Sequence, residues 1–129
     1  MDILSLFFIF IAIELFESNW QKSESLHGLL NNNYSIYRTN ILLFFLLNVS
    51  FIYSIFLIIY LQNNTFLMLS IVGIKFIDIA FKISIMSKIS KGIHLDEIMP
   101  NIKVGLILRY LNAIVYPITF LIAMDYFIL

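Results

Sequence analysis

The sequence predicts an all-α integral membrane protein that folds as a bundle of four transmembrane helices. The first observation is composition: of 129 residues, 61% are apolar and 12% are charged, with a mean hydropathy of +0.96. Soluble domains carry about 25% charged residues. The second observation is a series of four long apolar segments. The third is that the Lys and Arg residues of the loops occur only in the two longer connections between these segments. A soluble domain is therefore excluded, and the net charge of zero excludes a nucleic-acid partner.

The first two spans are predicted at residues 3–20 and 41–61, because a membrane helix needs about 20 mostly apolar residues. The first contains acidic groups in its inner half. It lacks the basic start and the cleavage site of a signal peptide, so we expect a retained span. The second contains no charged residue and is predicted to be one continuous helix.

The third and fourth spans are predicted at residues 65–86 and 104–129. The polar turn Gln62–Asn64 is short enough to make spans two and three a tight antiparallel hairpin. Pro100 is expected to open the last helix, since proline is favoured at the first helical position. The four spans form one domain over residues 1–129.

The two longer linkers, Glu17–Asn40 and Ser87–Lys103, hold the basic loop residues and are predicted to be cytoplasmic, with both termini outside. In the first linker we expect a short surface helix within Ser23–Leu30 and a break at Asn31–Asn33. In the second we expect a break at Lys91–Gly92. The expected location is the plasma membrane, the inner membrane of a bacterium.

Six polar residues are predicted to form a network inside the membrane: Glu14, Glu17, Lys75, Asp78, Arg109 and Asn112. A charge near the bilayer centre costs about 2.5–3.5 kcal/mol on insertion scales, so such groups face the protein interior and pair. A rise of ~1.5 Å per residue places Glu14 level with Lys75. Arg109 matches Glu17 in depth and, less closely, Asp78. We expect a polar seam between spans one, three and four, with span two peripheral and facing lipid or a partner.

The charges allow two functional interpretations. Because acidic and basic groups nearly balance, the first is structural: an accessory subunit of a membrane protein complex, with the lipid bilayer, membrane subunits or further copies of itself as partners. The alternative is a small homo-oligomeric channel or transporter for protons or cations that uses Glu14, Glu17 and Asp78. We expect this alternative to need an oligomer, because four helices leave little room for a cavity.

The third interpretation is an integral membrane enzyme, for which a lipid-modifying activity is the least unfavourable form. No catalytic motif in the sequence supports it. No catalytic residue, cofactor or metal is predicted. Cysteine is absent, and His27 and His94 lie in linkers rather than in facing spans, where haem would need them. An alternative set of metal ligands is His94, Asp96 and Glu97, joined by His27 across the loops.

Overall fold

The structure, a computed structural model, describes residues 2–124, which are largely helical and contain no strand. The helices in chain order are α1 (Ile3–Gln21), α2 (Leu26–Thr39), α3 (Ile41–Leu47), α4 (Val49–Leu61), α5 (Phe66–Ser90), α6 (Leu95–Ile98) and α7 (Leu106–Ala123). The all-α prediction is thus confirmed for this part of the chain. The outer end of the predicted fourth span, residues 125–129, lies outside the described residues.

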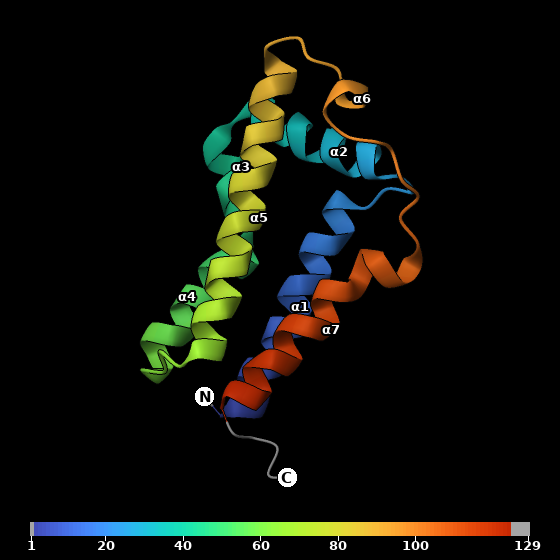
Figure 1. Cartoon of the computed structure of the whole chain (residues 1–129). Helices are drawn as coiled ribbons and strands as arrows, with labels where there is room; N and C mark the ends of the chain where they lie inside the picture. Colours follow the sequence, from blue (N-terminus) through green and yellow to red (C-terminus); the bar gives the residue numbers. More distant parts are fainter. Residues whose placement is uncertain (1, 125–129) are drawn as a thin grey trace.

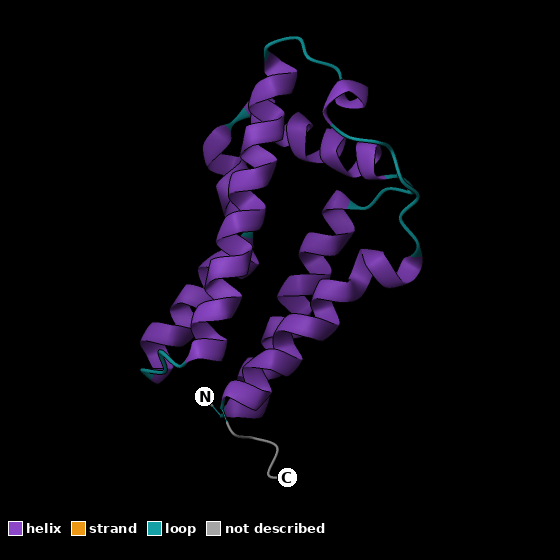
Figure 2. Cartoon of the chain, viewed as in Figure 1, coloured by secondary structure: helices purple, strands orange, loops and turns teal. Residues whose placement is uncertain are grey.

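The long helices form two antiparallel pairs (Figure 1). Helix α1 lies beside α7, and α4 lies beside α5, while α2 crosses near one end of both pairs. The start of α1, the α4–α5 turn and the end of α7 gather at the opposite end. Loops and turns are confined almost entirely to these two ends (Figure 2). The segments that the sequence assigns to opposite membrane faces are therefore at opposite ends of the fold.

Two clusters of buried apolar side chains hold the helices together. The first joins α1, α4, α5 and α7 near the chain ends and contains Leu6, Phe10, Tyr53, Leu57, Met68, Ile71, Phe120, Leu121 and Ala123. The second, made by Phe44, Ile79 and Met86, joins α3 to α5 beneath α2. On α5, the buried Lys75 comes between the residues of the two clusters. Apolar packing therefore flanks the polar groups on both sides.

Several predicted helix boundaries are confirmed. The segment 3–20 corresponds to α1, which ends one residue later. Helices α4 and α5 form the expected hairpin about Gln62–Asn64, where Gln62 takes the left-handed conformation (φ 51°). Helix α5 continues past the predicted end at residue 86 and ends at Ser90. The expected break at Lys91–Gly92 is confirmed there, with Gly92 at φ 91°, a conformation that glycine adopts without steric cost.

The segment predicted as a continuous second span, residues 41–61, is instead broken at Asn48 into α3 and α4, which are bent by 59°. The Asn48 side-chain nitrogen donates to the Phe44 carbonyl oxygen at 2.8 Å, and the Asn48 backbone leaves the helical region (φ −87°, ψ 58°). Short polar side chains that bond to nearby backbone compete with helical hydrogen bonding in this way. The break leaves the first amide groups of α4 without helical partners.

The expected break at Asn31–Asn33 is wrong, because these residues lie within α2. The side-chain nitrogen of Asn32 donates to the carbonyl oxygens of Gln21 and Lys22 at 3.0 and 2.9 Å. That of Asn33 donates to the Gln21 side chain at 3.1 Å. Since the end of α1 supplies these acceptors, the asparagines attach α2 to α1 instead of interrupting it.

The expectation that Pro100 opens the last helix is also wrong, because α7 begins only at Leu106. The chain between them is extended and pairs with the segment before α2. The Leu26 amide donates to the Ile102 carbonyl, and the Val104 amide donates to the Glu24 carbonyl, both at 2.8 Å. This pairing satisfies backbone groups that a helix would otherwise satisfy, and it joins the two linkers.

Two of the described helices have the length and hydropathy of membrane-spanning helices. Helices α1 and α7 are each long and apolar enough to cross a membrane, and the bent pair α3–α4 adds a third crossing if it is one span. Helix α5 is 25 residues long, but charged residues interrupt its apolar sequence. Large apolar side chains are exposed along the helices, among them Phe66 at 83% and Ile107 at 77%. A lipid bilayer covers such surface, which a soluble monomer rarely exposes.

Candidate functional site

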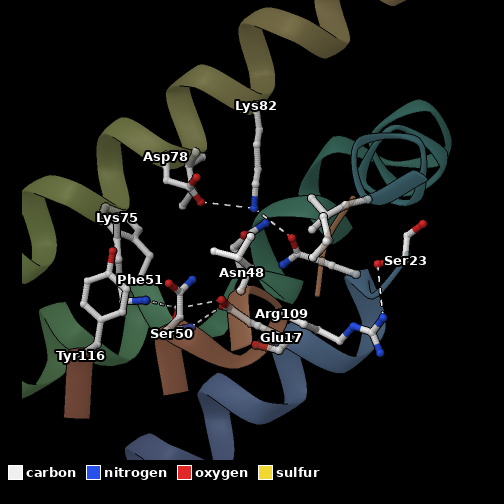
Figure 3. A pocket seen from close by; sticks show the side chains of 17 residues that line it. Glu17, Ser23, Asn48, Ser50, Phe51, Lys75, Asp78, Lys82, Arg109 and Tyr116 are labelled. Atoms are coloured by element: carbon white, nitrogen blue, oxygen red, sulfur yellow. Dashed lines mark hydrogen bonds and ion pairs between the residues drawn. The ribbon is translucent and has the colours of Figure 1, made fainter. Parts of the chain in front are cut away.

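A polar cavity of about 180 Å³ lies among α1, α4, α5 and α7. Figure 3 shows the side chains that line it. Five of the six residues predicted to form a network line this cavity: Glu17, Lys75, Asp78, Arg109 and Asn112. The sixth, Glu14, is bonded to Lys75. A single copy of the chain therefore contains a cavity, and its small volume agrees with the expectation that four helices leave little room for one.

Lys75 of α5 is the most highly connected charge at the cavity. Its ammonium group forms a salt bridge with the Glu14 carboxylate of α1, as their depths predicted, and it donates to Ser50 Oγ at 2.8 Å. It also lies 3.8 Å from the centre of the Tyr116 ring of α7. Both charged side chains are buried, Lys75 at 5% and Glu14 at 0% exposure. This arrangement compensates a buried cation with a charge, a hydroxyl and a ring face, and it joins four helices.

Glu17 of α1 caps the broken helix α4. Its Oε1 accepts from the Ser50 backbone amide at 2.6 Å, and its Oε2 accepts from Ser50 Oγ at 2.7 Å. The amide is available because the break at Asn48 places Ser50 in the first turn of α4. A carboxylate is stabilised there by the positive end of the helix dipole. The break at Asn48 therefore provides the amide that Glu17 binds, and Glu17 in turn satisfies a donor that the break leaves without a helical partner.

Asp78 and Lys82 pair along α5. Their charged groups are 3.2 Å apart, and the Lys82 ammonium also donates to Gln21 Oε1 of α1 at 2.9 Å. The Asp78 side chain is 50% exposed and that of Lys82 12%. The pair thus lies at the edge of the cavity and also links α5 to α1.

The predicted pairing of Arg109 with Glu17 or Asp78 is wrong. Arg109 forms no salt bridge in the described part of the chain. Its Nη2 lies 3.5 Å from the Ser23 carbonyl oxygen, and its buried Nε has no hydrogen-bond partner there. In Figure 3 the guanidinium extends toward Ser23 and away from Ser50. Arg109 lines the same cavity as Glu17 and Asp78, but Ser50 and Lys82 bind those carboxylates instead.

The second predicted span is not peripheral. Asn48, Ser50 and Ser54 are all buried, and the buried Tyr53 hydroxyl donates to the Leu6 carbonyl oxygen of α1 at 2.8 Å. Ser50, Tyr53, Ser54 and Leu57 recur at helical spacing on one face of α4. The sequence already contains this periodicity. It indicates a buried face on the second span, because polar residues of a membrane helix face the protein interior.

The linker histidines do not join the polar cavity. His27 Nδ1 lies 3.5 Å from the Asp96 carboxylate, and its Nε2 lies 3.0 Å from the Met99 carbonyl oxygen. His94 lines a separate pocket with His27 and Asp96. Across residues 2–124, no group of three histidine or acidic side chains is arranged to hold a metal ion. These contacts attach α2 to the linker before α7.

Comparison of the chain with protein-family models, curated protein sequences and solved structures finds no match. The arrangement itself must therefore indicate the chemistry. Charged and hydroxyl groups of this kind can bind protons, ions or small polar molecules, and here they join helices.

Proposed function

We propose that the chain is a four-span integral membrane protein that serves as a non-enzymatic, accessory subunit of a membrane protein complex. The proposed spans are α1, the bent pair α3–α4, α5 and α7. The burial of Lys75 supports α5 as a span, since its charge is removed from the surface that lipid would contact. The basic residues of both linkers favour a cytoplasmic position for α2 and α6 in the plasma membrane.

The observation that carries this proposal is that the chain itself provides a hydrogen-bond donor for each of the three carboxylates. Glu14 is bound by Lys75, Glu17 by Ser50, and Asp78 by Lys82. A group that conducts ions must exchange its partners, whereas these contacts join the three helices α1, α4 and α5. The partners left for such a protein are the bilayer and other membrane subunits, because its outer helix faces are apolar.

The test is extraction of the protein from its own host in mild detergent, followed by native mass measurement and identification of the co-purifying chains. The proposal predicts a stable assembly with one or more different membrane proteins, and loss of this chain from membranes when the partner is deleted. A chain that stays stable as a monomer or homo-oligomer without co-purifying proteins would contradict it.

The second candidate function is a homo-oligomeric proton or cation channel or transporter. One observation favours it: the cavity contains two carboxylates, and that of Asp78 is half exposed. Reconstitution in liposomes tests this directly by proton and cation flux. A channel that uses this cavity loses flux in Asp78→Asn and keeps it in Asp96→Asn, which changes an exposed linker carboxylate outside the cavity. Absence of flux in the wild-type protein excludes this candidate.

A further inference from the structure

The charges of the polar cavity are not all paired with one another. Lys75 binds Glu14, and Lys82 binds Asp78. Two charged groups of opposite sign remain. Glu17 has only the neutral donors of Ser50, and Arg109 has only a long contact to the Ser23 carbonyl oxygen.

The separation of these two charges is a specific feature of the cavity. Both Glu17 and Arg109 line it, yet they form no salt bridge with each other. In Figure 3, Glu17 lies beside Ser50 while the guanidinium of Arg109 points toward the opposite side, at Ser23. A ligand with a net charge would compensate one of them and leave the other uncompensated. A ligand that carries both signs compensates the two together.

The chemistry of each charge defines the complementary group. The planar guanidinium of Arg109 has free N–H donors, which suit the oxygens of a phosphate. Each oxygen of Glu17 accepts one hydrogen bond from Ser50 and retains a further lone pair. That capacity suits the N–H donors of an ammonium group. The cavity volume of about 180 Å³ is below the ~300–1,000 Å³ of sites for drug-sized ligands, so the bound group is small.

The exposed part of the cavity lining lies on α5 and α7, so we infer an opening between these two helices. The exposed residues that line it are Asp78 on α5 and Leu108 and Asn112 on α7. Leu108 is 57% exposed, and Phe81, one turn from Asp78, is 54% exposed. Apolar surface thus borders a polar opening, which is the arrangement that a lipid headgroup and its acyl chains require.

We propose that the polar cavity binds a small dipolar ligand, with a phosphodiester group at Arg109 and a primary ammonium group at Glu17. This chemistry is that of an ethanolamine phosphodiester, which occurs in the headgroup of phosphatidylethanolamine and in the soluble diester glycerophosphoethanolamine. The inference goes beyond the proposed accessory function and does not depend on it.

The test measures binding to the purified full chain in detergent micelles. Calorimetry compares glycerophosphoethanolamine with glycerophosphoglycerol, which has the phosphodiester but no ammonium. Native mass spectrometry makes the same comparison with phosphatidylethanolamine and phosphatidylglycerol. We expect about tenfold preference for the ethanolamine form in at least one pair, the effect of one charged hydrogen bond. Preference in the lipid pair alone identifies a lipid site, and preference in the soluble pair identifies a site open to free diesters.

Variants connect the binding to the cavity. Arg109→Gln is expected to weaken binding about tenfold or more, and Glu17→Gln to remove the preference for ethanolamine. Asn112→Phe introduces a bulky ring at the cavity without changing either charge, and it should also abolish binding. Lys91→Gln removes an exposed cation outside the cavity and serves as the matched control, with affinity unchanged. Circular dichroism verifies the helical content of each variant.

Two results would overturn the proposal. One is equal or absent binding of the ethanolamine and glycerol forms in both pairs. The other is ethanolamine binding that persists in Arg109→Gln and Asn112→Phe. These two variants decide the question even where Glu17→Gln loses its fold through loss of the cap on α4.

Discussion

The salt bridge between Glu14 and Lys75 gives the sharpest test of how the helices are held together. The perturbation is a double-mutant cycle of Glu14→Leu, Lys75→Met and both changes combined. Lys75→Met leaves the carboxylate of Glu14, at 0% exposure, without its counter-charge. Glu14→Leu leaves the Lys75 cation with Ser50 and the Tyr116 ring.

The expected magnitudes follow from these contacts. Removal of one partner of a buried pair costs about 3–5 kcal/mol. Glu14→Leu should fall at the lower end, about 3 kcal/mol, because the remaining ring contact contributes up to about 2 kcal/mol to a desolvated cation. The double variant removes both buried charges of this pair and loses mainly the bond to Ser50, about 1 kcal/mol. The single costs sum to about 6 kcal/mol or more, so the free energy of unfolding of the double variant should exceed the additive expectation by about 5 kcal/mol.

Unfolding by SDS in mixed micelles, followed by fluorescence, measures these energies. The chain has a single tryptophan, Trp20, whose indole N–H donates to the Leu47 carbonyl oxygen of α3 at 3.1 Å, so its emission reports the contact between α1 and α3. If the destabilisation of the double variant equals the sum of the single variants, the two side chains do not interact and the reasoning is refuted.

Three further predictions concern the elements around this pair. Ser50→Ala should lower the free energy of unfolding by about 1–3 kcal/mol, because Glu17 loses a hydrogen-bond donor at a buried site; an unchanged SDS midpoint would contradict this. Asn48→Leu should destabilise by about 1 kcal/mol in the same assay, since the Phe44 carbonyl oxygen loses the side-chain donor at 2.8 Å and keeps the backbone amide at 3.3 Å. A more stable variant would show that the chain prefers a straight helix. Gly28→Ala should lower the free energy of unfolding, because the added Cβ would lie 1.9 Å from Ser23 Oγ and 2.9 Å from Ser23 Cβ. Adding Ser23→Gly should restore the stability of Gly28→Ala, and failure to do so would place the strain elsewhere.

The sequence was most informative where polar residues interrupt apolar runs. Helix α1 and the hairpin turn at Gln62–Asn64 follow from segment length alone, because a helix of given length has a fixed rise. The same rise located Glu14 opposite Lys75, since both helices were counted from the same membrane face. Depth therefore predicts pairing when two helices are straight and each group has one possible partner.

The prediction of pairing from depth was wrong where a backbone amide binds the carboxylate that was assigned to a charged side chain. Arg109 and Glu17 were predicted to pair because their depths in the membrane match. The break at Asn48 instead leaves the Ser50 amide free to donate to Glu17. An asparagine gives no sign of such a break in the sequence, because a bond from its side chain to the carbonyl oxygen four residues earlier does not by itself end the helix. Asn33 makes the same kind of contact, to the Leu29 carbonyl oxygen at 3.0 Å, and it also donates to Gln21 at the end of α1, yet α2 continues.

The most direct test of the account is whether α5 crosses the membrane with Lys75 inside it. The chain has no cysteine, so Asn64→Cys and Ser90→Cys place single exposed labels at the two ends of this helix. In intact cells, a membrane-impermeant maleimide should label Asn64→Cys directly and Ser90→Cys only after the membrane is opened. Labelling of both positions from the same face would show that α5 does not cross, and the proposed four-span topology would be wrong.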